Sequence, residues 1–474
     1  MSNPYKLFKS RRFLPLFVVQ FLGAMNDNIY KNALIILVSF SLAQLQAFSP
    51  KMPLAIASGL FILPYLLFSA ISGELADRLD KEKMIQWVKL AEVLILGIAA
   101  TLGFYLQSLF LLYLTVFLLG THSTFFGPLK YAILPQHLAK EELLFGNSWI
   151  EASTFLAILS GTLLGGLLIL KPNGIFIISL LLFSLALIGW FASFFIPKAK
   201  SENPNLKINY NIFKATYDII HYTFKRKEIR LPVLGISWFW FIGSSFLTIV
   251  PLYTKEVLQS NETTTTLLLT LVTVGIGIGS LASYILLRGK ITAKFVPLAN
   301  LGLSLFCFLL IIKPLVYISA FGIGLCGGIY SVPLYALLQY KSDAEYRSRN
   351  IASNNIMNAL FMIGSSLIAM FVFQLNGGSI TLLTVIAILN LAVTLYLFWA
   401  ISKNTLLNIV SIFIKCIFKI LYRVKINNLE NLPPKGERAM IIANHVSLLD
   451  AALIRLFISD HFTYPIDTDT SKKL

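Results

Sequence analysis

The sequence predicts an all-α polytopic membrane protein of twelve helices in two groups of six, followed by a short tail of different character. Of its 474 residues, 57% are hydrophobic and only 13% are charged, whereas a soluble domain carries about 25% charged residues. Apolar runs of about 20 residues, the length of a membrane-spanning helix, recur along the chain. Alternating segments of about 10 residues, typical of a membrane β-barrel, do not recur. These observations exclude an isolated soluble enzyme, a DNA-binding protein and a disulfide-stapled secreted domain.

The apolar runs form two sets of six on either side of one long polar stretch. The expected spans are 13–42, 53–75, 84–106, 109–129, 146–170, 174–196, 231–255, 264–287, 293–312, 315–338, 350–373 and 379–402. The expected domains are a first six-helix half at 1–197, a cytoplasmic central loop at 198–230, a second half at 231–403 and a tail at 404–474. Two six-helix halves around a midplane site are typical of secondary transporters.

The basic residues predict the orientation of these spans. The net charge is +17, from 39 lysines and arginines and 22 acidic residues. With a cytoplasmic N-terminus, the inside segments hold 23 basic residues, including Lys294 at the edge of a span, and the outside loops hold four. Because basic loops stay on the cytoplasmic side, we expect both termini there. The positive charge therefore indicates topology and not a nucleic-acid partner.

The cysteines and the N-terminus indicate no further processing or metal chemistry. The three cysteines contain no C-x-x-C pair, so the sequence predicts no disulfide framework, no metal site and no cofactor. The basic N-terminus precedes an apolar stretch that is too long for a signal-peptide core. We therefore expect a retained first span.

Span one carries charged residues near its middle, where they are costly and mark functional sites. Asp27 and Lys31 are four residues apart and share one helix face, with Asn28 beside them. A zwitterionic headgroup has a phosphate for Lys31 and an ammonium for Asp27. The alternative, that the two residues simply neutralise each other, is equally open from the sequence.

Other polar residues inside the spans have simpler explanations. Lys89 and Glu92 in span three are three residues apart and are expected to form a structural pair. His122 in span four is expected to be a packing histidine. Glu151 is expected at the start of span five, where an acid suits a helix N-terminus.

The loop between spans two and three reads G-E-L-A-D-R-L-D-K-E-K over residues 73–83. It resembles the loop signature of the major facilitator superfamily, G-x-L-A-D-R-x-G-R-K, although Asp80 replaces the second glycine. Gly73 is expected to let helices approach closely. Asp77 sits at a helix end, where it can pair with Arg78 or with a neighbouring helix. The resemblance implies the twelve-helix major facilitator fold.

Two further stretches narrow the resemblance. F-G-P-L-K-Y-A-I-L-P-Q at 126–136 and N-S-W-I-E-A-S-T at 147–154 are similar to motifs of the lysophospholipid transporters of bacterial inner membranes. The resemblance covers roughly residues 10–400. It implies inward movement of lysophospholipid, chiefly lysophosphatidylethanolamine, for re-acylation. The match also makes Glu151 a candidate substrate-binding residue together with Asp27, Lys31 and Asn28.

The tail combines an amphipathic segment with a catalytic motif. Residues 405–423 place their polar positions on one stripe, which predicts a helix lying in the cytoplasmic interface. N-H-V-S-L-L-D at 444–450 resembles the first motif of glycerolipid acyltransferases, which implies His445 as general base and Asp450 as its orienting partner. The later E-G-T-R motif is absent, and about 30 residues follow His445. The tail is therefore expected to be an incomplete, inactive α/β acyltransferase segment.

Together, these features predict a lysophospholipid transporter of a bacterial inner membrane that works by alternating access. Its partners would be the lysophospholipid, membrane lipids and a separate acyltransferase or acyl-carrier-protein synthetase chain. Two alternatives stay open. One is a facilitator of another small solute, and the other is a membrane-tethered acyltransferase that needs a second chain for its missing motifs.

Overall fold

The computed structural model of the protein is helical throughout the part of the chain that it describes. The described residues are 4–40, 52–401, 418 and 453. The chain divides into two compact units, Met1–Leu395 and Tyr396–Leu474. The tail motif with His445 and Asp450 lies outside the described residues, as does the expected interfacial helix at 405–423 apart from residue 418.

The first half consists of long apolar helices with short connections. Its elements are η1 (Pro4–Lys9), α1 (Leu14–Phe40), α2 (Met52–Arg78), α3 (Lys81–Leu94), η3 (Ile95–Ala100), α4 (Thr101–Tyr105), α5 (Leu109–Ala132), α6 (Leu134–His137), α7 (Lys140–Ile169) and α8 (Gly174–Ser193). The segments α3, η3 and α4 follow one another without a break, and η3 is a single π-helical stretch within them.

The second half repeats this pattern after one extra helix. Its elements are α9 (Ile212–Lys225), α10 (Lys227–Glu256), α11 (Glu262–Leu287), α12 (Val296–Leu309), η4 (Lys313–Leu315), α13 (Val316–Lys341), η5 (Ala344–Tyr346), α14 (Arg347–Gln374) and α15 (Ser379–Ile401). Helix α9 lies inside the central loop at 198–230, which the sequence interpretation treated only as a polar loop.

Ten helical segments among the described residues are long and apolar enough to cross a membrane. The prediction of an all-α polytopic membrane protein is therefore confirmed. Two expected spans fall outside this set for visible reasons. Helix α1 has 27 residues but interrupts its apolar run with Asn26, Asp27 and Asn28, and α12 has only 14 residues.

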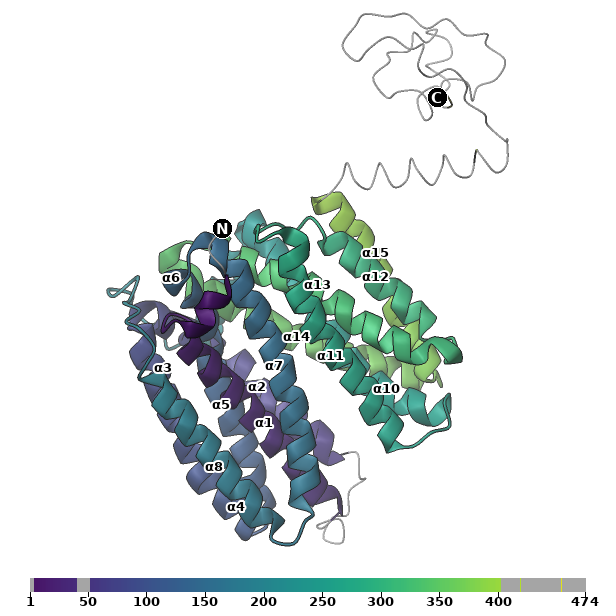
Figure 1. The fold of residues 1–474 in the computed structure, drawn as a ribbon, viewed down its shortest axis with the longest axis horizontal. Coiled ribbons are helices and arrows are strands. Elements are labelled where there is room, and N and C mark those ends of the chain that lie inside the picture. Colours follow the sequence, from purple (N-terminus) through teal and green to yellow (C-terminus); the bar gives the residue numbers. More distant parts are fainter. Residues whose placement is uncertain (1–3, 41–51, 402–417, 419–452, 454–474) are drawn as a thin grey trace, which may run out of the picture. The chain divides into compact units, whose positions relative to one another are not determined.

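Each half has its own apolar core, so each is held together independently of the other. The first core gathers buried side chains of α1, α5, α7 and α8, among them Leu34, Leu119 and Ile178. The second gathers side chains of α10, α12, α13 and α15, among them Ile249, Leu303 and Ile386. Figure 1 shows the first half in purple to blue and the second in teal to green.

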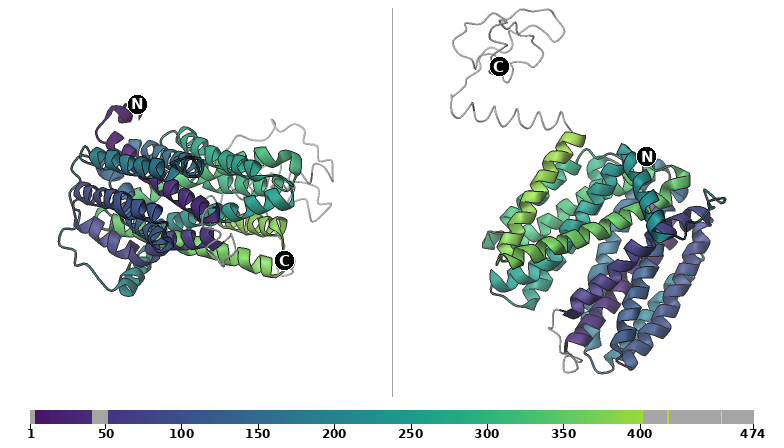
Figure 2. Two further views of the ribbon diagram at one scale, coloured as in Figure 1. Left: turned by 90° about the horizontal axis from the view of Figure 1, so that it is seen from below. Right: turned by 180° about the vertical axis from the view of Figure 1, so that it is seen from behind.

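The contacts between the halves gather at one end of the bundle. Helix α2 packs along α14, and α7 packs along α11. In Figures 1 and 2 the two groups of helices meet near the N-terminus and diverge toward the opposite end. Gly73 is needed at this junction because a Cβ there would lie 2.6 Å from Cβ of Ala352 and 3.0 Å from Cα of Arg349.

Candidate functional site

Asp27 and Lys31 lie near the middle of α1 but bind different neighbours. Oδ2 of Asp27 accepts a hydrogen bond of 2.6 Å from the hydroxyl of Ser123 on α5, and Oδ1 has no hydrogen-bond partner among the described residues. The ammonium of Lys31 lies 4.1 Å from the ring centroid of Phe61 on α2, a cation–π contact. No ion pair within 4.0 Å joins the two charges in the described structure.

Asn28 points away from this pair. Its side-chain amide donates a hydrogen bond of 2.8 Å to the carbonyl oxygen of Ala24 in its own helix. Its Cβ lies 2.9 Å from the position that a Cβ at Gly161 of α7 would take, so α1 and α7 approach closely there. The structure therefore places Asn28 in the α1–α7 contact and not beside the carboxylate of Asp27.

A cluster of aromatic and charged side chains joins the two halves beneath Asp27. Tyr131 of α5 and Tyr335 of α13 stack with ring centroids 4.6 Å apart and planes 9° apart. The Tyr131 hydroxyl donates to Glu151 of α7, and Nε1 of Trp240 donates 3.1 Å to the Tyr335 hydroxyl. Lys130 interacts electrostatically with Glu151. Each half therefore contributes side chains to this cluster.

Glu151 does not occupy the helix start that the sequence suggested. Helix α7 begins at Lys140 and is capped by Glu142, whose carboxylate accepts from the backbone N–H of Ala139 at 2.9 Å. Glu151 is therefore well inside the helix and is buried. The prediction that it serves the helix N-terminus is wrong, and its partner is the Tyr131 hydroxyl.

Tyr65 of α2 lies near polar groups of both halves. It interacts electrostatically with Asp27 and lies within hydrogen-bonding reach of Ser123. It also interacts electrostatically with Tyr335 of the second half. The sequence interpretation missed Tyr65, Ser123 and Tyr335, because nothing in the linear sequence links residues so far apart.

A second buried charge cluster lies behind α1. Lys89 and Glu92 of α3 form an ion pair, as their spacing predicted, and both side chains are fully buried. Nδ2 of Asn26 donates 3.1 Å to Oε1 of Glu92, and Nε2 of His122 lies 3.5 Å from Oε2 of the same carboxylate. His122 is buried beside this ion pair and stacks on Phe126 of its own helix, with ring centroids 6.2 Å apart.

Asp77 closes the junction between the halves. Its carboxylate accepts from the backbone N–H of Ser348 at 2.9 Å and from Nε of Arg349 at 2.9 Å, at the start of α14. An anion at a helix N-terminus is stabilised by the unpaired N–H groups there. Arg78 is exposed. Of the two partners expected for Asp77, Arg78 or a neighbouring helix, the structure shows the neighbouring helix α14.

Glu202 of the central loop binds both halves. Its Oε2 lies 3.6 Å from Nζ of Lys81 on α3, and its Oε1 lies 3.3 Å from Nη1 of Arg347 on α14. The preceding backbone is fixed as well, since the N–H of Ala199 donates 2.8 Å to Glu82. The central loop therefore acts as a strap across the joined end.

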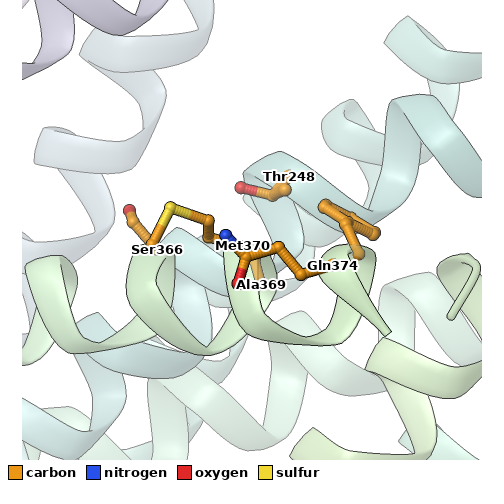
Figure 3. Close-up of a pocket in the computed structure, with 6 residues that line it drawn as sticks. Thr248, Ser366, Ala369, Met370 and Gln374 are labelled. Carbon is orange, nitrogen blue, oxygen red and sulfur yellow. The ribbon is translucent and has the colours of Figure 1, made fainter. Parts of the chain in front are cut away.

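The second half has a hollow of about 510 Å³ between α10 and α14 (Figure 3). Its lining residues are Thr248, Ser366, Ala369, Met370, Phe373 and Gln374. Asn355 of α14 faces Gly127 of the first half. Ser366 lies 11 residues, about three helical turns, after Asn355 and is therefore on the same face of α14. The hollow is therefore on the side of α14 that faces the first half.

The described residues contain no group of three His, Cys, Asp or Glu side chains that could hold a metal ion. Cys307 and Cys326 are free thiols.

A multi-pass bundle with two helical halves around a shared polar centre defines a membrane transporter. Comparison with protein families supports this class, because the Major Facilitator Superfamily matches residues 16–366. The chain belongs to the Major Facilitator Superfamily.

Individual relatives and solved structures are also similar to this chain. The chain is 29% identical over 345 residues to the lysophospholipid transporter LplT of Photorhabdus laumondii subsp. laumondii, covering 70% of this chain and 80% of that protein. It is 28% identical over 375 residues to LplT of Escherichia coli O157:H7, covering 77% and 90%.

Among solved structures, the human organic anion transporter MFSD10 shares the fold with a TM-score of 0.67 at 14% identity, over 81% of this chain and 98% of that one. FucP in its outward conformation has a TM-score of 0.64 at 12% identity, over 82% and 99%.

Proposed function

We propose that this protein moves lysophospholipid, chiefly lysophosphatidylethanolamine, from the outer to the inner leaflet of a bacterial inner membrane. The observation that carries the proposal is the state of Asp27 and Lys31. Both charges lie near the middle of α1, one turn apart, and no direct ion pair joins them in the described structure, since Asp27 accepts from Ser123 and Lys31 contacts Phe61. Two separated opposite charges suit a ligand that has one ammonium and one phosphate.

In this proposal Asp27 binds the ammonium, and Lys31 binds the phosphate. Oδ1 of Asp27 is free to accept a hydrogen bond, and the cation–π contact of Lys31 can be exchanged for a phosphate oxygen. The apolar hollow on α10 and α14 offers a surface to the acyl chain. Glu151 acts with Tyr131 and Tyr335 beneath the headgroup, where the two halves meet.

The transport cycle is proposed as alternating access between two six-helix halves. Helices α1 and α12 complete the ten candidate spans to twelve. Both termini are assigned to the cytoplasm, because basic residues concentrate on that side of the predicted topology. The joined end with Asp77 and Glu202 is then cytoplasmic, and the structure has its cytoplasmic side closed.

The tail motif extends the proposal toward re-acylation. His445 and Asp450 match the base and the orienting residue of the first acyltransferase motif, which links the proposed transport to acyl transfer. The transported lipid would be passed to a separate acyltransferase or acyl-carrier-protein synthetase chain.

The test is uptake of labelled lysophosphatidylethanolamine by cells that lack their own transporter and express this chain. We expect uptake by the wild type and by a chain ending at residue 403. We expect uptake to fall about ten- to a hundredfold in Asp27→Asn and in Lys31→Ala. No uptake by a well-expressed, correctly inserted wild type would contradict the proposed substrate. Uptake by both span-one variants at the wild-type rate would contradict the proposed site.

A further inference from the structure

Helix α9 has one face packed against the protein and a second face whose large aromatic side chains are exposed in the described structure. Asn211 caps it by accepting from the N–H of Lys214 at 3.1 Å. Its inner face buries Ala215 and Ile219 against Ala70 of α2 and Ile356 of α14. The helix therefore contacts both halves of the transporter.

The outer face carries large aromatic side chains that the described structure leaves open. Phe213 is 85% exposed, Tyr217 is 65% exposed, and Tyr210 just before the helix is 77% exposed. Phe213 and Tyr217 are four residues apart within α9, so they form one stripe on the helix. Exposed lysines lie along the same segment at Lys207, Lys214 and Lys225.

The position of α9 indicates whether lipid or water surrounds this stripe. Its partner Ala70 lies eight residues before the end of α2, about 12 Å inside the span at the helical rise per residue. Both helices beneath α9, α2 and α14, belong to candidate membrane spans. The outer face of α9 therefore lies beside the bilayer, near the headgroup layer at the joined end, and not on a surface remote from the membrane.

Aromatic rings and lysines together are the residues that stabilise a helix at a membrane interface. The rings enter the boundary between headgroups and acyl chains, and the lysines attract anionic phosphates. A contiguous exposed apolar patch on a soluble surface is unfavourable, whereas the same patch is satisfied by lipid. The charge of the segment selects anionic lipid among lipid partners.

We propose that the outer face of α9 is a binding surface for anionic phospholipid headgroups at the joined end of the transporter. Because α9 packs on α2 of one half and α14 of the other, bound lipid holds the helix across the seam between the halves. The binding surface requires only that the chain spans a membrane. Its effect on transport rests on the proposed function.

The first test measures the depth of α9 in nanodiscs. The native cysteines are replaced, and a spin label is attached at Phe213→Cys or, as a control, at Glu345→Cys in the exposed turn before α14. We expect the label at 213 to be more accessible to oxygen than to nickel ethylenediaminediacetate, and the label at 345 to show the reverse. Equal, water-like accessibility at both positions overturns the proposal, including the case in which a soluble protein is the true partner.

The second test addresses lipid charge. A Lys207→Gln, Lys214→Gln, Lys225→Gln variant is compared with wild type in phosphatidylethanolamine vesicles with and without phosphatidylglycerol. We expect phosphatidylglycerol to change the wild-type transport rate on the order of a few-fold and the variant to lose this response while it still transports lysophosphatidylethanolamine. A wild type that transports but ignores phosphatidylglycerol overturns the role of anionic lipid. If wild type does not transport at all, the proposed function fails, and the depth measurement still decides the binding surface.

Discussion

Two acid–lysine pairs lie close together in the first half, at nearly the same helical spacing, and the structure treats them differently. Lys89 and Glu92 form a direct, fully buried ion pair. Asp27 and Lys31 sit on the adjacent helix and turn to Ser123 and Phe61 instead. A closed pair is compensated by the protein alone, whereas a separated pair keeps charge available for a ligand. Under the proposed function, this difference makes Asp27 and Lys31 the proposed binding site and the pair of Lys89 and Glu92 its proposed support.

The largest expected effect comes from opening the closed pair. Removing one partner leaves an uncompensated buried charge, so Lys89→Met or Glu92→Gln should cost about 3–5 kcal/mol of stability. We expect a large fall in the thermal unfolding temperature of the purified protein in detergent. The double variant Lys89→Met, Glu92→Leu should recover much of this loss, because no unpaired charge remains. Single variants as stable as wild type would contradict the supporting role of this pair.

The separated pair should respond in the opposite way. Asp27→Asn and Lys31→Ala should lower transport by about ten- to a hundredfold, the value of one or two charged hydrogen bonds. Their unfolding temperatures should fall less than those of the Lys89 and Glu92 variants, since Asp27 and Lys31 form no direct ion pair in the described structure. Glu262→Gln, at the exposed start of α11, is the control for loss of an acidic charge. A fall in stability as large as that of Glu92→Gln would remove the distinction between the two pairs.

Sequence reasoning was sufficient where a local pattern decides the outcome. Hydropathy predicted the helical membrane class, and the spacing of Lys89 and Glu92 predicted their pairing. It failed where partners come from distant helices. The spacing of Asp27 and Lys31 is as favourable for pairing, but Ser123 and Phe61 of other helices decide their directions. Glu151 was misplaced because the polar first turn of α7 lies outside the hydropathy window. Tyr335 lies about 200 residues after its stacking partner Tyr131, so no local sequence pattern links the two.

A moderate effect is expected at the junction of the halves. Asp77→Asn weakens charge-assisted hydrogen bonds to Ser348 and Arg349, so the joined end should open more often. The distance distribution between spin labels at Leu79 and Lys341, on opposite halves, should gain a longer component. Arg78→Gln is the matched neighbour and should leave the distribution unchanged. If Arg78→Gln opens the junction and Asp77→Asn does not, the assignment of the partner is wrong.

The smallest effect concerns Asp80, outside the spans. The hydrogen bond from Lys83 and the backbone N–H of Ser201 hold the pKa of the Asp80 carboxyl below its usual value. A carboxyl whose pKa falls on folding stabilises the folded state above its usual pKa and loses this contribution as the pH drops through the folded value. Asp80→Asn should therefore lower the unfolding temperature slightly at pH 7, with the difference shrinking in acid. A difference that grows in acid would contradict this sign.

In the proposed binding mode, Asp27 binds the ammonium of a zwitterionic headgroup and Lys31 binds its phosphate. Competition between lysophosphatidylethanolamine and lysophosphatidylglycerol, which lacks the ammonium, tests it most directly in reconstituted vesicles. We predict that Asp27→Asn loses the preference for ethanolamine over glycerol, whereas Lys31→Ala weakens transport of both lipids and keeps their ratio. An unchanged preference in Asp27→Asn would contradict the account, because the carboxylate would then not contact the ammonium.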